Sequence, residues 1–456
     1  MKLSTKLAIA HLAVLGPFCA AESVHQRKLR YSDKVVAEDI AATEMEAWER
    51  ILSDGSMSVP SKPAPSPAPK PSKPTVSDCC GLPPGQRAKE LLALYSDVSD
   101  PKDIVTPGTP QFKAFNWILT DDAFCVCPND PGCEPVQRYV MAVYYYSTVG
   151  EGWTNCGADS TICNATASEE RSGCFPGHTS PWLADVQSCD WCGNDCDDPN
   201  YPGCITQINL DNITQSGTIP FELQNITYLY YISNEDGTIS STIPPELGNL
   251  KNLSFFDLNF QDIEGSIPDS FYKRDSLALI DLNDNKMTGS ISSDICNLPD
   301  LFFLQLGNDK DGTNDFSGTL PNCIGSLSKL KVLDVSKVGL VGTLPSFTQP
   351  TLQFLDVSQN ELTGNLDGTN WGALTGLQTL VLGENKFTGT IPSSIGKIPG
   401  LRLADFTNTD LTGTMPSEIC ATRTPPVGNG TLEFLQADCA GTPPQVTCTC
   451  CTFCSP

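Results

Sequence analysis

A short glycine motif recurs through the second half of this 456-residue chain, and it constrains the fold more than any other feature. In each copy an apolar residue stands two positions after the glycine, and proline often follows. The glycines are 22 to 29 residues apart from Gly217 to Gly413, with Ser241 replacing glycine once. A regular period of this length predicts a solenoid of stacked coils, because each coil can bury its apolar residues only against its neighbours. The copies are SGTIP at 216–220, STIP at 241–244, EGSIP at 264–268, TGSI at 288–291, SGTLP at 317–321, VGTLP at 341–345, TGNL at 363–366, TGTIP at 388–392 and TGTMP at 412–416.

Leucines occupy fixed positions in front of each glycine. The clearest copy reads LQTLVLGENKFTGTIP at 377–392, and the copy at 352–366 follows the same pattern without the final proline. This pattern resembles the plant-type leucine-rich repeat, L-x-x-L-x-L-x-x-N-x-L-x-G-x-I-P. The resemblance implies an α/β solenoid, a right-handed superhelix of about nine such repeats with the leucines inside. It also implies a tight turn at the glycine and a second short strand at isoleucine-proline.

The asparagine of this repeat is expected to bond to buried backbone groups of the neighbouring coil. It is present at Asn285, Asn360 and Asn385, and other residues take its place elsewhere. The gaps predict loops that are looser, or in which water replaces the side chain.

The chain is strongly acidic, with a net charge of −25. Nucleic acids and anionic lipid surfaces attract Lys and Arg, so neither is an expected partner. A basic protein or peptide, a neutral glycan or a divalent cation suits this charge better. The sequence does not indicate an oligomeric state.

The first 21 residues have the features of a secretory signal. Lys2 and Lys6 precede an apolar run at 7–15, and small residues end at Ala21, where we expect cleavage. An uncleaved anchor is the alternative, but the apolar run is short for a membrane span. With the signal removed, no span is expected, and the protein would be secreted.

Residues 22–78 are expected to form a disordered stalk. Proline alternates with serine, alanine and lysine at 60–77, which favours an extended spacer without a core. The spacer is either a wall-associated tether or a plain linker.

The cysteines divide the rest of the chain into modules. Of 21 cysteines, Cys19 leaves with the signal, twelve lie in an N-terminal cap at 79–204, and six lie in a C-terminal cap at 420–456. The remaining two, Cys296 and Cys323, lie in the repeat array at 205–419 and are predicted to form a disulfide. Even numbers in every module favour closed sets of disulfides in an oxidising compartment. Five glycosylation sequons agree with secretion: Asn164, Asn212, Asn225, Asn252 and Asn429.

The N-terminal cap is predicted to contain helices at 86–98 and 136–148, where apolar residues have helical spacing. The four tyrosines of the second helix are expected to pack around it rather than to form a ligand platform. They are Tyr139, Tyr144, Tyr145 and Tyr146.

The cap ends in CDWCGNDC at 189–196, which resembles the N-terminal cap of plant-type leucine-rich-repeat proteins. The resemblance implies a disulfide between Cys189 and Cys196. For the extra cysteines we suggest a pair between Cys192 and Cys204. The spacing of the first three cysteines also suits a metal site, but disulfides are favoured in an oxidising compartment.

Strand residues alternate between the core and the concave surface, so each repeat presents two outward positions. One column is apolar and partly aromatic, and the other is rich in aspartate. An exposed aromatic stripe and adjacent carboxylates favour a site for a basic, partly apolar protein or peptide. For the aspartates, the repeat consensus alone is an equal alternative. The predicted ligand-binding residues are Tyr231, Phe255, Phe303, Phe354, Asp257, Asp281, Asp334, Asp356 and Asp405.

One repeat carries five extra residues in an oxygen-rich loop. Its side chains could hold calcium, which binds several oxygens from one flexible loop. A solvated turn is the alternative, because the loop lacks a complete calcium-binding pattern. The candidate ligands are Asp309, Asp311, Asn314 and Asp315.

An enzyme is not expected, and neither is a cofactor. Outside the signal the histidines are His25 and His178, and neither accompanies a recognisable nucleophile motif. Residues 79–456 resemble secreted plant-like leucine-rich-repeat proteins of the diatom type. The favoured hypothesis is an extracellular recognition or adhesion protein that binds a protein or peptide on its concave sheet. The alternatives are a secreted hydrolase inhibitor, similar to the plant polygalacturonase inhibitors, and a structural cell-wall or ice-surface protein.

Overall fold

The computed structural model describes residues 80–83, 85–153, 156–158, 180–210, 213–308, 312–424, 428 and 430–455. These residues belong to two compact units, one ending at Leu253 and the other beginning at Ser254. The signal, the stalk, His25 and His178 lie outside the described residues. So do Asn164, Asn212 and Asn429.

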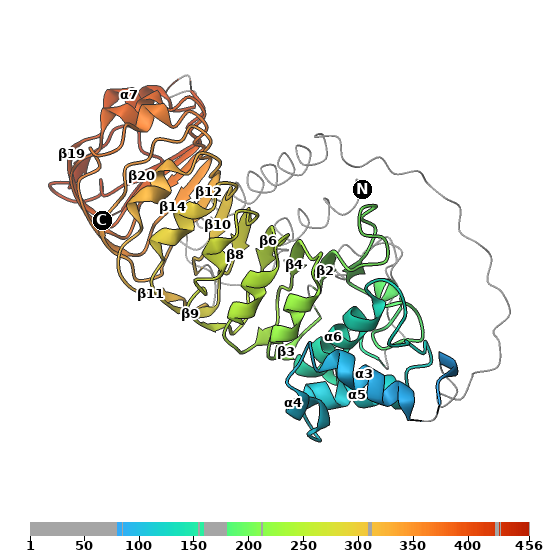
Figure 1. Ribbon diagram of the computed structural model, residues 1–456. Coiled ribbons are helices and arrows are strands. Elements are labelled where there is room, and N and C mark those ends of the chain that lie inside the picture. Colours follow the sequence, from blue (N-terminus) through green and yellow to red (C-terminus); the bar gives the residue numbers. More distant parts are fainter. Residues whose placement is uncertain are drawn as a thin grey trace. The chain divides into compact units, whose positions relative to one another are not determined.

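The first unit begins with four helices, coloured blue to teal in Figure 1. Asp100 and Thr109 accept backbone N–H groups at the starts of the second and third helices, each of which begins with proline. These are favourable N-terminal signals, because the first N–H groups of a helix lack partners within it. Both predicted helices are present within three residues of their expected bounds. The helices are α3 (Gln86–Tyr95), α4 (Pro101–Val105), α5 (Pro110–Thr120) and α6 (Glu134–Ser147).

The tyrosines of α6 pack as predicted. Tyr139, Tyr144 and Tyr145 are buried. The ring of Tyr145 contacts Trp153 and Trp182, with centroids 5.1 and 6.3 Å away. These aromatic contacts form the core of the cap.

The first coils follow the helices in the same unit. Strand β1 (Asn194–Asp195) pairs antiparallel with β2 (Gln207–Asn209), and β2 pairs parallel with β4 (Tyr231–Ser233). The shorter elements are η2 (Gly150–Gly152), η3 (Ser188–Asp190), β3 (Ser216–Gly217), η4 (Phe221–Asn225), β5 (Thr238–Ile239) and η5 (Pro245–Asn249). The contact of α6 with η4 joins the helices to the first coil.

The second unit is built on nine parallel strands, one from each coil, in sequential order along the sheet. Equivalent residues pair directly, so each strand position forms a straight column across the sheet. This one-strand-per-coil order is that of a leucine-rich-repeat solenoid, as predicted. The strands are β6 (Phe255–Asp257), β8 (Leu279–Asp281), β10 (Phe303–Gln305), β12 (Val332–Asp334), β14 (Phe354–Asp356), β16 (Thr379–Val381), β18 (Leu403–Phe406), β20 (Phe434–Ala437) and β22 (Phe453–Cys454).

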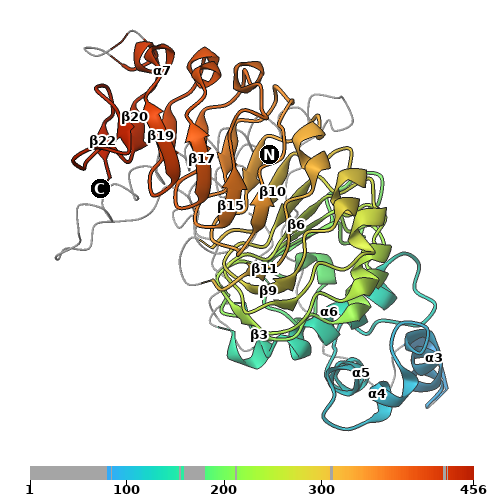
Figure 2. The ribbon, with the colours of Figure 1, turned by 90° about the vertical axis from the view of Figure 1, so that its left-hand side faces the viewer.

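A second set of short strands lies on one flank of these coils, as the repeat pattern implied. Figure 2 shows β15, β17 and β19 side by side on this flank. The glycine that marks each repeat lies in or beside these strands and has a φ of 77 to 95° in the second unit, a conformation that favours glycine. The flank strands are β7 (Glu264–Gly265), β9 (Lys286–Gly289), β11 (Asp315–Phe316), β13 (Val341–Thr343), β15 (Glu361–Gly364), β17 (Lys386–Thr390), β19 (Asp410–Thr414) and β21 (Val446–Thr447).

Short helical turns complete the coils, and buried leucines from each coil fill the interior. Leu377, Leu380 and Leu382 of one repeat have no exposed surface. The turns are η6 (Phe271–Lys273), η7 (Ser293–Asn297), η8 (Asn322–Ser326), η9 (Trp371–Ala373), η10 (Ser393–Lys397) and α7 (Ser417–Ala421).

Four asparagines, one more than predicted, play the role of the repeat asparagine and bond to backbone groups of a neighbouring coil. Asn360 donates to the carbonyl groups of Val335 and Val357 and accepts the N–H group of Leu340. The additional member is Asn314. The sequence alignment missed it because the five-residue insertion displaces it from its expected position.

Asn314 makes the same kind of contact from the end of the inserted loop. Its Nδ2 donates to the carbonyl groups of Leu282 and Leu306, both at 2.9 Å, and its Oδ1 accepts the N–H of Met287 at 2.8 Å. The coil with the insertion therefore keeps its bonds to the neighbouring coil.

Disulfides close the array and the C-terminal cap. Cys296 pairs with Cys323, as predicted. The six cysteines of the C-terminal cap pair among themselves, as Cys420–Cys450, Cys439–Cys454 and Cys448–Cys451.

In the N-terminal cap one predicted pair is correct and one is wrong. Cys189 pairs with Cys196. The suggested pair of Cys192 with Cys204 is wrong, because Cys204 pairs with Cys133 at the start of α6. Cys192 is disulfide-bonded to a different residue.

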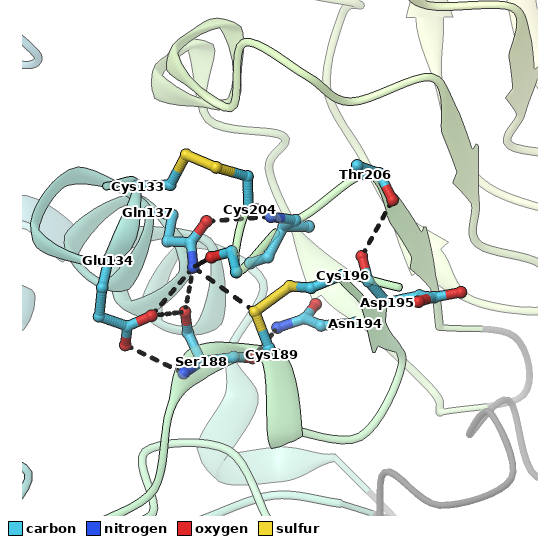
Figure 3. The surroundings of a disulfide bond; sticks show 12 residues. Cys133, Glu134, Gln137, Ser188, Cys189, Asn194, Asp195, Cys196, Cys204 and Thr206 are labelled. Carbon is cyan, nitrogen blue, oxygen red and sulfur yellow. Dashed lines mark hydrogen bonds between the residues drawn. A yellow bond between two sulfur atoms is a disulfide. The ribbon is translucent and has the colours of Figure 1, made fainter. Parts of the chain in front are cut away.

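Figure 3 shows the reason for the Cys133–Cys204 pair. Gln137, one turn into α6, accepts the N–H of Ile205 and donates to the carbonyl of Gly203, both at 3.0 Å. These bonds hold the loop that carries Cys204 against the start of α6. No motif or spacing in the sequence predicts that these two segments meet.

Candidate functional site

The site residues predicted in the second unit lie on one side of its sheet. We call this side the strand face: the outward side of β6 to β18, made by the first and third residues of each strand. The middle residues, such as Leu333, point to the core and have no exposed surface. Burial alone does not separate the two sides of these strands, so the inward and outward positions rest on alternation along each strand.

The acidic column is interrupted rather than continuous. Asp257 pairs directly with Asp281, and Asp334 pairs directly with Asp356. Gln305 separates these two pairs in the column, and further along Val381 precedes Asp405. The strand face thus presents two carboxylate pairs and one single carboxylate, at a strand spacing of about 4.8 Å.

Each of these aspartates also has a structural role. Its Oδ1 accepts the backbone N–H group two residues further on, which closes the turn after the strand. The acceptor–donor pairs are Asp257–Asn259 (3.3 Å), Asp281–Asn283 (3.1 Å), Asp334–Ser336 (2.9 Å), Asp356–Ser358 (2.8 Å) and Asp405–Thr407 (2.8 Å). The repeat consensus therefore has a physical cause at this position.

The apolar column differs from the prediction in its exposure. Phe255, Phe303 and Phe354 were expected to be exposed, but they are 5%, 1% and 6% exposed. Side chains on neighbouring strands are close enough to cover each other's flanks. Phe302 adds to this cover, because its ring lies 6.3 Å from that of Phe255 and 6.4 Å from that of Phe303. Tyr231 belongs to the first unit, where it is half-buried.

Asn314 and Asp315, the two predicted calcium ligands that are described, differ in their surroundings. The side chain of Asn314 is buried and bonds the coils together, whereas Asp315 is exposed on β11. Asp309 and Asp311 lie outside the described residues. Because Asn314 already uses both ends of its amide, it is not available to a cation.

A charged cluster in the first unit was not predicted. Arg138 of α6 has no exposed surface, and its guanidinium donates to both oxygens of the buried Asp122, at 2.6 and 2.9 Å. The same guanidinium lies over the rings of Trp117, Phe124 and Trp191, with centroids 5.2, 4.5 and 4.9 Å away. The ion pair and the contacts with the ring faces together stabilise this buried cation in the absence of water. The cluster joins α5, α6 and the CDWCGNDC segment.

A second buried acid lies where α6 meets the first coil. Glu222 of η4 has no exposed surface, and its Oε1 accepts the Oγ of Ser99 and the Nε2 of Gln111, both at 2.8 Å. Its Oε2 has no partner among the described residues. Burial raises the pKa of Glu222, and the two hydrogen bonds oppose the rise. An isolated glutamate in a repeat gives no signal of this environment.

Two of the predicted glycosylation sites are described, and both are half-buried. The Nδ2 of Asn252 donates to the carbonyl of Thr227 at 3.3 Å. The Nδ2 of Asn225 donates to the carbonyl of Glu222.

Comparison with known proteins identifies the repeat. The family model described as Leucine Rich Repeat matches residues 376–398. Receptor-like protein 35 of Arabidopsis thaliana is 34% identical over 148 residues, which cover 27% of this chain and 15% of that protein. The chain carries plant-type leucine-rich repeats. Receptor-like protein 53 of the same plant is 35% identical, with the same two coverages.

Solved structures of plant proteins are also similar to this chain. One is described as the plant peptide hormone receptor RGFR1 in complex with RGF2, with 29% identity and a TM-score of 0.45, covering 47% of this chain and 34% of that one. Another is a plant ice-binding protein, with 22% identity and a TM-score of 0.41, covering 52% and 82%. Within the described part of the chain, none of the helices is long and apolar enough to span a bilayer.

Proposed function

We propose that this protein is an extracellular recognition protein that binds a basic, partly apolar protein or peptide on the strand face. The predicted signal and the disulfides of both caps support an extracellular location, because such sets form in oxidising compartments. Membership of the secreted, diatom-type group is part of the same proposal and rests on the cap segments. Plant receptors among the relatives share the repeat, although each is matched over a small part of its length.

One observation carries the proposal: an apolar column and an acidic column run side by side across the strand face. They stand at the first and third strand positions, as in Phe354 and Asp356 of β14. Asp334 and Asp356 are direct neighbours in the sheet, so a cation between them would relieve their repulsion. The flanking apolar side chains would remove water from an aliphatic or aromatic neighbour of that cation.

The distance between the two carboxylate pairs predicts the spacing of basic residues in the ligand. The first carboxylate pair and the second are centred three strands apart, or about 14 Å. An extended peptide advances about 3.4 Å per residue. A chain that crosses the strands would therefore place basic residues about four positions apart over the two pairs, with apolar residues between them.

The test uses the full chain and a short synthetic peptide with two lysines about four residues apart and leucines between them. We expect micromolar binding by calorimetry, and weaker binding as salt is raised. The double change Asp334→Asn with Asp356→Asn is expected to weaken binding about tenfold or more, because both carboxylate charges are lost. Each asparagine keeps the Oδ1 that closes the turn, so the fold should be retained.

The matched control is Glu361→Gln with Asp410→Asn, which removes the same charge from the flank strands. Its binding should equal that of the original chain. Equal loss in both double variants would show a general charge effect rather than a site. Failure of the peptide to bind the original chain, at low salt and high concentration, would contradict the proposed ligand class.

A second candidate function is binding to an ordered surface such as ice or a crystalline wall polysaccharide. In seven coils of the second unit, an exposed small polar residue follows the repeat glycine, and these residues form a column along the flank. Hydroxyl and amide groups at the regular coil spacing could match a repeating lattice of oxygen atoms. The residues are Ser266, Ser290, Thr319, Thr343, Asn365, Thr390 and Thr414.

This candidate is tested with Thr343→Tyr and Thr390→Tyr, which break the regular column at exposed positions. Inhibition of ice recrystallisation, or retention on cellulose or chitin, should fall sharply in the double variant. An equally bulky change at exposed Lys329 is the control. If the original chain shows neither activity, the candidate is wrong.

A further inference from the structure

Sulfur atoms from different disulfides come together in the C-terminal cap. The Sγ of Cys448 lies 4.0 Å from the Sγ of Cys450, although the two cysteines belong to different bonds. The Sγ atoms of Cys439, Cys448 and Cys451 all lie within 4.8 Å of one another. Three disulfides therefore meet at one place, and they are Cys420–Cys450, Cys439–Cys454 and Cys448–Cys451.

The Cys448–Cys451 bond differs from the other two in the length of chain that it closes. Its cysteines are three positions apart, whereas the other bonds of this cap join cysteines 15 and 30 positions apart. In the chain-entropy account, a bond across a short loop restricts the unfolded chain least. This bond therefore contributes the least stability of the three, and it can open with the least damage to the fold.

Solvent reaches the segment that carries this bond. Cys448 and Cys451 are half-buried in the turn between β21 and β22, and the neighbouring Thr449 and Thr452 are exposed. Cys450, which lies between them in the sequence, is only 5% exposed. A thiolate in solution must contact a sulfur atom to exchange with it. The Cys448–Cys451 bond offers such contact at the surface, with a second disulfide directly beneath it.

The disulfide of the repeat array lacks this arrangement. Cys296 and Cys323 are also half-buried, so access alone does not distinguish the two places. They are 27 positions apart, however, and neither belongs to a group of three neighbouring cysteine sulfurs in the described part of the chain. A thiolate released from this bond has no such group beside it.

In the cap, the released sulfur has an acceptor within reach. When an external thiolate bonds to one sulfur of the Cys448–Cys451 pair, their S–S bond breaks and the other sulfur leaves as a thiolate. Either sulfur would lie within 4.8 Å of Cys439. Its attack there forms a new disulfide and releases Cys454 as a thiolate, which takes up the proton that the incoming thiol lost. One thiol is consumed and one appears, so no further oxidant or reductant is needed.

The last step would change the end of the array. Cys454 lies in β22, the last strand of the sheet, which pairs with β20 (Figure 2). The bond to Cys439 ties this strand to the chain just after β20. The exchange would remove that covalent tie, whereas backbone hydrogen bonds such as that from Ser455 to Ala437, at 2.9 Å, would remain. The end strand would be loosened without being released.

We propose that the Cys448–Cys451 pair is an exchange site for low-molecular-weight thiols, and that Cys439 accepts the sulfur that is released. The incoming thiol stays attached to the cap as a mixed disulfide, and the covalent tie of β22 is opened. The site lies in the C-terminal cap, so this inference is independent of the strand face and of its ligand.

The test treats the folded full-length chain with glutathione at increasing concentrations. Free thiols are then alkylated, and the chain is digested with pepsin in acid, where thiols are protonated and exchange stops. At the lowest concentration that reacts, mass spectrometry should find glutathione on Cys448 or Cys451 and an alkylated Cys454. Modification of this cap should exceed that of Cys296 and Cys323 at least about tenfold.

Two results in the original chain would overturn the proposal. Equal modification of the cap and of the array bond would exclude a preferred exchange site. Alkylation of Cys420, or of Cys448 or Cys451 beside an intact Cys439–Cys454 bond, would exclude Cys439 as the acceptor.

A pair of matched variants shows whether the reaction belongs to the short-loop bond. Cys448→Ser with Cys451→Ser should abolish attachment of glutathione to the cap at that concentration. Cys296→Ser with Cys323→Ser removes the array bond and should leave attachment to the cap unchanged. Equal loss of attachment in both variants would contradict the proposal. The mapping of the original chain needs neither variant, so it decides the matter even if one of them does not fold.

A third variant isolates the acceptor. Cys439→Ser with Cys454→Ser keeps the exchange site and removes the disulfide beside it. Glutathione should still attach, and the alkylated thiol should now be Cys448 or Cys451. An unmodified cap in this variant, with the fold intact, would contradict an exchange site at the Cys448–Cys451 pair.

Discussion

The N-terminal cap and the repeat array use charge in opposite ways. In the cap, Arg138 and Asp122 are fully buried and form an ion pair. The surroundings of this pair occur nowhere else in the described chain. In the array, the same aspartate turn recurs from coil to coil, and each copy depends only on residues two positions apart. Removing one contact in the cap should therefore cause a large loss of unfolding free energy. Removing one contact in the array should cause a smaller loss, because each coil contributes separately to stability.

Removing Arg138 should produce the largest effect. Arg138→Ala leaves Asp122 buried without its partner, which costs about 3–5 kcal/mol of unfolding free energy. Denaturant unfolding followed by tryptophan fluorescence measures the loss. The control is Lys386→Ala, which removes the exposed pair of Lys386 with Glu361 and should change stability little. Similar losses in both variants would remove the distinction between cap and array.

Removing one asparagine that bonds the coils together should have an intermediate effect. Asn360→Ala and Asn314→Ala each leave buried backbone groups unpaired, which costs about 2–3 kcal/mol. The control is Asn365→Ala, because that exposed side chain bonds only the N–H of Asp367. A loss at Asn360 without one at Asn314 would show that the inserted loop does not act as a regular coil.

The buried Glu222, in the first coil beside α6, should give a smaller, pH-dependent effect. The pKa of Glu222 is raised above its ordinary value of 4.5, mainly by burial. The folded state therefore holds this proton more tightly than the unfolded state. The stabilisation that comes from the protonated Glu222 is fully present below pH 4.5. It falls as the pH rises through the folded pKa, by at most about 1.4 kcal/mol per pH unit.

The variant Glu222→Gln carries no titratable proton and should remove this part of the pH dependence. The measurement is unfolding free energy at a series of pH values for both chains. Glu246→Gln, in the equivalent turn of the next coil, is the control. An unchanged slope in Glu222→Gln would mean that the carboxyl is ionised in the folded protein.

The N-terminal cap and the repeat array also differ in how much of their structure could be predicted from the sequence. The repeats made the strands, the turn at Gly389 and the Cys296–Cys323 pair predictable, because each depends on a pattern that recurs. The contacts of Arg138 and Cys204 were not predictable, since each joins segments far apart in the sequence without a repeated signal.

Within the array, the failures came from breaks in the pattern. The insertion hid Asn314 as a bond between coils and made it look like a calcium ligand. The exposure of the phenylalanines on the strand face was predicted wrongly, because they are 1–6% exposed. Alternation says which way a side chain points, and it says nothing about what lies over it.

The most direct test of the central claim is a footprint of the carboxylates with the basic synthetic peptide bound. Carbodiimide labelling with a small amine, followed by mass spectrometry, reports the access of each carboxylate in the full chain. We expect the peptide to lower labelling at the half-buried Asp257, Asp356 and Asp405 and to leave the exposed Glu361 and Asp410 unchanged. Protection of the flank carboxylates, with none on the strand face, would contradict it.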